Sequence, residues 1–98
     1  MRTGVYDIER VNEDTIFLRI NLLPRDCKEL NGILGSHINS REWITVVLKR
    51  DGIEKIVVYS ENDNKEYNIT ELYSPAEKEA ILENATKYAE QLLKKEEE

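Results

Sequence analysis

Trp43-Ile-Thr-Val-Val-Leu-Lys-Arg-Asp-Gly-Ile-Glu-Lys-Ile-Val-Val-Tyr-Ser60 is the stretch that decides the fold. Two runs rich in β-branched and aromatic residues, 43–49 and 53–60, flank the dipeptide Asp51-Gly52. This dipeptide is the one that best accommodates the positive φ angles of a two-residue hairpin turn. The stretch therefore predicts an antiparallel β-hairpin.

The predicted turn also fixes which side chains share a face of the hairpin. It places Lys49 opposite Glu54 and Val46 opposite Val57. One face then carries Ile44, Val46, Leu48, Val57 and Tyr59, and the other carries Trp43, Val47, Ile56 and Val58. Both faces are apolar, which indicates a hairpin in the centre of a sheet with cover on both sides.

Further strands are expected on either side of this hairpin. Residues 16–22 alternate like a strand with one buried face, and residues 5–11 form a weaker strand pattern. Asn12-Glu13-Asp14 has turn composition, so these two strands are predicted to pair as a hairpin that ends before Pro24. After a further polar turn, residues 66–72 are predicted as a fifth strand.

A short helix is expected after Pro24. Asp26, followed three residues later by Glu29, suits an N-cap and its reciprocal partner, and Gly32 suits the left-handed residue that stops a helix. Residues 32–42 contain two glycines and follow no clear period. We expect this segment to be mostly loop.

Ser74-Pro75-Ala76-Glu77 is a strong start signal for a second helix, because it combines a serine cap, a first-turn proline and a reciprocal glutamate. The helix is expected to run from Pro75 to about Lys94. The apolar stripe that should pack on the sheet consists of Ile81, Leu82, Ala85, Tyr88, Ala89, Leu92 and Leu93. The acidic residues 96–98 are expected to fray, because negative charge is unfavourable at a helix C-terminus.

These elements predict an α+β fold with the order β-β-short α-β-β-β-α. A mainly antiparallel sheet of about five strands is expected to pack against one long, amphipathic C-terminal helix. The length of 98 residues predicts a single domain, residues 1–98. A core of this size gives a thin margin of stability, which favours a homo-oligomer, and a dimer before larger assemblies.

The formal net charge of −6 is unevenly spread along the chain. Residues 1–50 carry 8 basic and 7 acidic side chains, whereas residues 51–98 carry 6 basic and 13 acidic ones. From position 26 onward, the order of helix, three strands and helix is similar to that of double-stranded-RNA-binding domains. The start of the second helix, Pro75-Ala76-Glu77-Lys78-Glu79, lacks their basic cluster, so no family is assigned and no direct nucleic-acid partner is expected.

The sequence favours a cytoplasmic protein. Residues 1–7 lack the apolar stretch of a signal peptide, and no run of about 18 uncharged apolar residues occurs, so no membrane association is expected. Cys27 is the only cysteine, which excludes an intrachain disulfide and a multi-cysteine metal site. Such cysteine usage suits a reducing compartment.

No catalytic or cofactor motif is present: there is no glycine-rich phosphate loop, no dinucleotide fingerprint, no paired histidines and no calcium loop. Cys27 and His37 could form a thiolate–imidazolium pair. A buried cysteine and an ordinary loop histidine are the simpler interpretation. We therefore predict that the chain is not an enzyme and expect no catalytic residues, no cofactor and no metal site.

The most function-like segment is residues 35–43. Glycine exposes backbone N–H groups there, and serine, histidine and arginine side chains suit an anionic or phosphate-bearing ligand. Tryptophan and tyrosine near the ends of expected strands are placed to stack on a ring. The candidate ligand-binding residues are Ser36, His37, Arg41, Trp43 and Tyr73. The alternative is a plain connecting loop with aromatic residues that pack in the core.

Glu79, Glu83 and Glu90 form an acidic side of the expected C-terminal helix. Their simplest role is a solvated surface. The alternative is a partner-binding surface that mimics a phosphate backbone.

These observations favour a small, non-enzymatic binding module that associates with itself or with a protein partner. One alternative is an acidic inhibitor or decoy, of a kind that mobile elements encode, that occupies a basic nucleic-acid-binding surface. A second alternative is a binder of small anionic ligands that uses the 35–43 loop.

Overall fold

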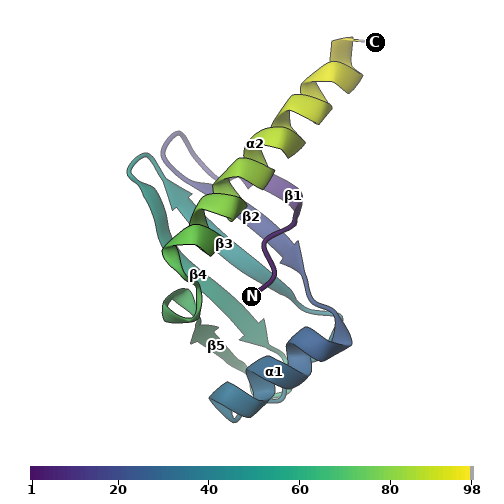
Figure 1. The fold of residues 1–98 in the computed structure, drawn as a ribbon, viewed down its shortest axis with the longest axis vertical. Helices are drawn as coiled ribbons and strands as arrows, with labels where there is room; N and C mark the ends of the chain where they lie inside the picture. Colours follow the sequence, from purple (N-terminus) through teal and green to yellow (C-terminus); the bar gives the residue numbers. More distant parts are fainter. Residues whose placement is uncertain (98) are drawn as a thin grey trace.

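The computed structural model describes the backbone of residues 1–97 and the side chains of residues 1–91, and a five-stranded antiparallel sheet lies at its centre (Figure 1). In the sheet the strands follow chain order: β1 (Val5–Arg10), β2 (Ile16–Asn21), β3 (Trp43–Lys49), β4 (Gly52–Ser60) and β5 (Lys65–Asn68). Every neighbouring pair of strands is antiparallel. The predicted α+β class, strand number and element order are confirmed.

Both α-helices of the described residues lie on one face of the sheet (Figure 1). α1 (Pro24–Leu34) lies across one end, and α2 (Pro75–Glu97) crosses the sheet obliquely, with its C-terminal part extending beyond the strands. A short 3₁₀-helix, η1 (Thr70–Leu72), connects β5 to α2. None of the helices in residues 1–97 is both long and apolar enough to cross a membrane.

The N-cap of α1 lies three residues before the predicted one. Leu23 occupies the cap position and Pro24 the first helical position, where the N–H that proline lacks would have no partner in any case. Asp26 lies in the first turn, and its Oδ2 accepts a hydrogen bond of 2.9 Å from the Leu23 N–H. The prediction of Asp26 as the N-cap is therefore wrong, because the proline fixes the start.

α1 also ends later than predicted. Gly35 adopts the left-handed conformation, with φ 64°, and its N–H donates to the Asn31 carbonyl at 2.9 Å. Gly32, the predicted stop, is a helical residue. A glycine inside a helix costs about 1 kcal/mol relative to alanine, but the extra turn lets Leu34 pack against the core. The predicted loop 32–42 therefore shortens to residues 35–42.

The start of α2 is the one that the sequence predicted. The Glu77 N–H donates to Ser74 Oγ at 3.1 Å, and the Ser74 N–H donates to Glu77 Oε1 at 2.9 Å. Two N–H groups that the helix itself leaves unpaired are thus satisfied reciprocally.

Among the described members of the predicted apolar stripe of α2, only two are buried. Ile81 and Ala85 are buried in the core, whereas Ala89 is exposed. The side chains of Leu92 and Leu93 lie outside the described residues. The expected fraying of residues 96–98 stays a prediction, because their side chains and the whole of Glu98 lie outside the described residues.

The turn between β3 and β4 lies one residue earlier than predicted. Lys49 pairs with Gly52 rather than with Glu54, so residues 50–51 form the turn. Gly52 is the first residue of β4 and has φ 119°, a value that other residues rarely adopt. Gly52 was predicted as the second residue of the turn. It is instead the residue that follows the turn, and it has the positive φ there.

A β-bulge then shifts the pairing of the two strands. The bulge lies between Val47 and Leu48, and Val46 consequently faces Ile56 rather than Val57. Because side chains alternate between the faces of a strand, a shift of one residue moves each side chain of β4 to the other face relative to β3. The predicted assignment of faces is therefore wrong for Ile56, Val57, Val58 and Tyr59.

The core lies between the sheet and the two helices. It consists of Leu18, Ile20, Leu22, Cys27, Leu30, Ile38, Ile44, Val46, Ile56, Val58, Ile69, Tyr73, Ile81 and Ala85. Burial of each large aliphatic side chain contributes about 1.5–3 kcal/mol, before the entropy cost of ordering it is subtracted. The β3–β4 hairpin is central, as predicted, but the described residues cover only one of its faces.

β5 is shorter than the predicted strand 66–72, because the chain turns inward after Asn68. Ile69 is fully buried, and its N–H donates to the Ile56 carbonyl at 2.8 Å. Thr70 Oγ1 accepts a hydrogen bond of 2.9 Å from the Ile56 N–H. Thr70 therefore provides the acceptor that a longer fifth strand would have provided to β4.

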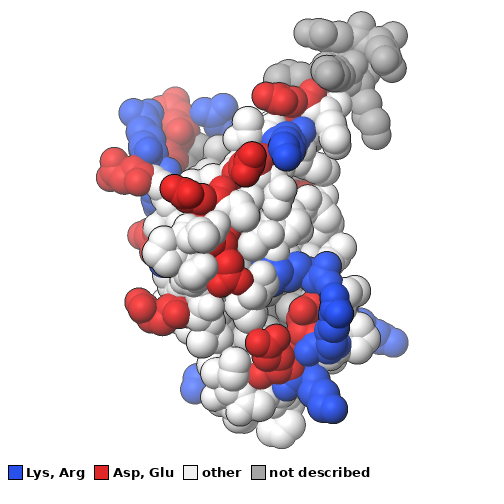
Figure 2. All heavy atoms as spheres, viewed as in Figure 1, with Lys and Arg blue, Asp and Glu red and all other residues white. Residues whose placement is uncertain are grey.

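Charge on the helical side of the molecule is mixed. Figure 2 shows carboxylates and basic side chains side by side over the described part of α2 and around α1. On α2 the exposed Lys87 lies between Glu83 and Glu90 in the chain, and all three are exposed. The predicted acidic stripe is thus interrupted by a cation.

Candidate binding surface

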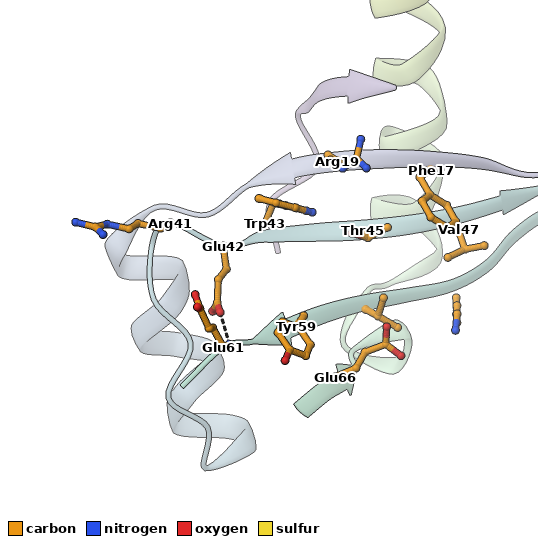
Figure 3. A pocket seen from close by; sticks show the side chains of 12 residues that line it. Phe17, Arg19, Arg41, Glu42, Trp43, Thr45, Val47, Tyr59, Glu61 and Glu66 are labelled. Carbon is orange, nitrogen blue, oxygen red and sulfur yellow. Dashed lines mark hydrogen bonds between the residues drawn. The ribbon is translucent and has the colours of Figure 1, made fainter. Parts of the chain in front are cut away.

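The face of the sheet opposite the helices has no cover from the described residues, and we call it the open face. Figure 3 shows it with both helices behind the strands. The side chains at its centre come from four strands: Phe17 and Arg19 of β2, Trp43, Thr45 and Val47 of β3, Lys55, Val57 and Tyr59 of β4, and Glu66 of β5. These are the positions that alternate with core residues along each strand.

The open face is hollowed. The hollow has a volume of about 550 Å³, and Arg41, Glu42 and Glu61 lie at the end where β3 begins and β4 ends (Figure 3). Two side chains at its floor, Val47 and Val57, are each only 5% exposed. The floor is therefore apolar and covered mainly by neighbouring side chains of the same face.

Two aromatic side chains stand at the rim of this hollow. Trp43 is 45% exposed and Tyr59 is 49% exposed. They lie on adjacent strands, one residue beyond the paired Ile44 and Val58. The Tyr59 hydroxyl donates to Asn64 Oδ1 at 2.7 Å, which fixes the end of its ring. Large aromatic surface is thus held in place without being buried.

Arg19 is held beside the Trp43 ring by two carboxylates of β1. It contacts Glu9, and its Nη1 donates to Asp7 Oδ2 at 2.7 Å. These hydrogen bonds, with Glu9 contributing most, raise the pKa of the Arg19 guanidinium above its ordinary value. Its central carbon lies 5.9 Å from the centroid of the Trp43 ring, within the range of a cation–π interaction.

The remaining charges of the open face differ in how firmly they are fixed. Both oxygens of Glu42 accept backbone hydrogen bonds, from the Asn39 N–H at 3.2 Å and from the Glu61 N–H. Four other charged groups form no ion pair within the described residues: Arg41, Lys55, Glu61 and Glu66. Within the described residues, the open face therefore offers two cations and two anions whose charged groups have neither an ion pair nor a hydrogen bond, besides the hydrogen-bonded Glu42.

Of the five predicted ligand-binding residues, the structure brings Arg41 and Trp43 together at this hollow. Ser36 is buried, and its Oγ donates to Asn31 Oδ1 at 2.7 Å. Asn31 also receives the Ile38 N–H, at 2.8 Å. The serine hydroxyl therefore serves the local structure of the loop and is not available to an anion.

His37 is bound to the turn between β4 and β5. Its N–H donates to Asp63 Oδ2 and its ring Nδ1 contacts Asp63 Oδ1, both at 2.7 Å. Ser60 and Tyr67 also donate to Asp63, at 3.0 and 3.1 Å. These hydrogen bonds, above all the one from the His37 backbone, hold the pKa of the Asp63 carboxyl well below its usual range. Asp63 therefore anchors the 35–42 loop to this turn, and we call its contacts with His37 the latch.

Tyr73 and Cys27 both lie in the core. Tyr73 is 3% exposed, and its hydroxyl donates to the Arg2 carbonyl at 2.7 Å, so it does not reach the hollow. Burial raises the pKa of the Tyr73 phenol well above its usual range. Cys27 is 5% exposed, and burial likewise raises the pKa of its thiol. A thiol with a raised pKa is a poor nucleophile at neutral pH.

Several residues of the hollow were not identified from the sequence as candidate binding residues. Phe17, Val57 and Tyr59 were assigned to strands, but the slipped register placed Val57 and Tyr59 on the face with Ile44 and Val46. The alternation in residues 16–22 did contain the signal for Phe17 and Arg19, since it puts both opposite the buried face. Asp63 gave no local signal, because its partner His37 lies 26 residues away.

Comparisons of the chain with protein-family models, with curated proteins and with solved structures each gave no match. Within the part of the chain that the structure describes, no group of three or more His, Cys, Asp or Glu side chains is arranged to hold a metal ion.

Proposed function

We propose that this chain is a non-enzymatic binding module that takes a protein partner on the open face of its sheet. One observation carries the proposal: Trp43 and Tyr59 are each about half exposed beside a floor formed by Val47 and Val57. Tryptophan, tyrosine and arginine supply most of the binding energy in protein interfaces, and they act best beside a dry apolar floor.

The shape and charge of the open face favour a protein over a small molecule. The hollow extends across four strands and is only partly enclosed, whereas small-ligand sites enclose most of their ligand. The charges that form no ion pair within the described residues have both signs, namely Arg41, Glu42, Lys55, Glu61 and Glu66. A mixed rim around an apolar centre is typical of a protein interface, while nucleic acids require clustered cations.

The placement of the chain's two most reactive side chains supports a binding role over a catalytic one. Cys27 is buried in the core, and no hydrogen bond joins it to His37 within the described residues, so the two do not form a thiolate–imidazolium pair there. The predicted acidic decoy surface, Glu79, Glu83 and Glu90, is exposed on α2 but shares that helix with Lys87. A partner-binding role of this surface stays a prediction, because no contact among the described residues bears on it.

A library of random peptides displayed on phage tests whether the open face is the preferred binding surface. Peptides selected on the wild-type chain are expected to bind the double variant Trp43→Ala, Tyr59→Ala at least about tenfold more weakly. The matched control is Ile33→Ala on α1, because Ile33 is 54% exposed and lies on the helical side. Peptides that lose affinity for the Ile33 variant and keep it for the double variant would overturn the proposal.

A further inference from the structure

We infer that the partner is a second copy of this chain, stacked open face to open face about a two-fold axis that runs parallel to β3 and β4 and passes between them. The inference rests on the proposed function. It goes further in naming the occupant of the face and the symmetry that places it. Charge complementarity between the two halves of the open face carries it.

The pairing of β3 with β4 defines what such an axis exchanges. Ile44 pairs with Val58, so Trp43 and Tyr59 lie side by side at one end of the two strands. A two-fold axis between the strands brings β3 of one copy over β4 of the other. Trp43 then meets Tyr59 of the second copy, and the same contact occurs twice. Each exposed aromatic side chain gains an aromatic partner.

The same axis pairs the unneutralised charges at this end of the sheet. Arg41 lies two residues before Trp43, and Glu61 lies two residues after Tyr59. The axis therefore brings Arg41 of one copy to Glu61 of the other, again twice. Both side chains are exposed, and neither has an ion-pair partner in the described part of its own chain. Exposed arginine is free to turn toward such a partner.

Residues further out on the open face obey the same symmetry. Arg19 lies on β2 and Glu66 on β5, on opposite sides of the axis, so the rotation brings them to the same side. Lys55 lies on β4 in the row of Val47, and the axis places its aliphatic stem over Val47 of the second copy. Its ammonium group then reaches the rim, as long cationic side chains commonly do.

The alternative two-fold axis, perpendicular to the strands, is disfavoured by charge. Such an axis in the plane of the interface brings each strand over its own copy. An axis through the row of Thr45 would stack Arg19 on Arg19 of the second copy, while leaving Arg41 beyond the far end of the hollow. Like charges in contact oppose association.

Native mass spectrometry and sedimentation equilibrium of the full chain test the inference. The wild-type chain is expected to form a dimer in the micromolar range. Thr45→Glu, at the centre of the open face, is expected to weaken the dimer at least about tenfold. Lys87→Glu on α2 is the matched control and is expected to leave the dimer unchanged. A wild-type chain that stays monomeric throughout this range overturns the inference.

Reversal of the charges at Arg41 and Glu61 tests the position of the axis. Both side chains are exposed, so neither substitution disturbs the core. Arg41→Glu and Glu61→Arg are each expected to weaken the homodimer about tenfold or more, because each creates two like-charge contacts. Mixing the two variants is expected to restore a heterodimer, because every contact then joins opposite charges. Homodimers indifferent to both substitutions, or a mixture that fails to form the heterodimer, would overturn the proposed axis.

The selection of peptides on the open face separates this inference from the proposed function. A monomeric chain that still captures peptides through Trp43 and Tyr59 overturns the second copy as partner and supports the proposed function. A chain that neither dimerises nor captures peptides on this face overturns both.

Discussion

The two faces of the sheet are built from the same strands, and they differ in what covers them. Ile44 and Trp43 are neighbours on β3, yet Ile44 is fully buried beneath the helices and Trp43 is 45% exposed. Both faces are apolar at their centres, with Val46 on one and Val47 on the other. Cover by the two helices, and not hydrophobicity alone, therefore separates the face that stabilises this fold from the face that is available to a partner.

The largest expected difference between the faces is in the free energy of unfolding. Ile44→Ala is expected to cost about 2–5 kcal/mol, because it removes buried methylene groups and leaves a cavity in the core. Trp43→Ala, one residue away, is expected to cost less than about 1 kcal/mol at a concentration where the chain is monomeric. Urea denaturation followed by far-UV circular dichroism measures both. Equal losses would show that the open face is as closely packed as the covered one.

The fold was predictable where its signals are local. Ser74 and Glu77 lie within one turn, so their reciprocal cap could be inferred from the spacing alone. The register of β3 on β4 was not predictable in this way. Asp51-Gly52 is compatible with a turn at residues 50–51 or 51–52, and the bulge beyond Val47 depends on packing against the neighbouring strands.

The second-largest expected effect concerns the 35–42 loop, which Asp63 holds through His37. Asp63→Asn removes the charge that holds the His37 amide and ring, so the amides of residues 36–38 are expected to exchange with solvent about tenfold faster. Hydrogen exchange followed by NMR measures this. Asn62→Ala is the neighbouring control, since it removes only the side-chain bond to the His37 carbonyl.

The pH dependence of this latch has a definite sign. The pKa of Asp63 is lowered in the folded chain from its ordinary value of 3.8, so the stability it contributes is complete above that value. This stability is lost as the pH falls through the lower pKa of the native state. The loop of the wild-type chain is therefore expected to loosen in acid below pH 3.8, and that of Asp63→Asn to show no such step. An identical acid response in both chains would contradict the latch.

The candidate site was predictable only in part, again because of distance along the chain. Arg41 and Trp43 line the same hollow, as their separation of two residues on the way into β3 leads one to expect. Tyr73 was grouped with them from its position after an expected strand, but η1 turns the chain inward and buries it. His37 depends on Asp63, a partner that no local pattern reveals.

Matched tyrosine substitutions test the two faces with one chemical change. Tyr73→Phe removes a buried hydroxyl that donates to the Arg2 carbonyl at 2.7 Å, and is expected to cost about 1 kcal/mol. Tyr59→Phe removes an exposed bond to Asn64, and is expected to cost at most about half of that, because water replaces the lost partner. Thermal and urea unfolding measure both. A larger loss at Tyr59 would reverse the ranking of the faces.

The smallest effect is spectroscopic and leaves the sequence unchanged. Trp43 is the only tryptophan of the chain, so its fluorescence reports on the open face alone. Stacking of two open faces moves its 45% exposed ring from water to an apolar contact, and its emission is expected to shift to shorter wavelength as the concentration rises. Thr45→Glu should keep the emission at the monomer wavelength throughout. Constant emission in a wild-type chain that dimerises would place the contact on another surface, because a dimer formed through the helical side leaves the ring in water.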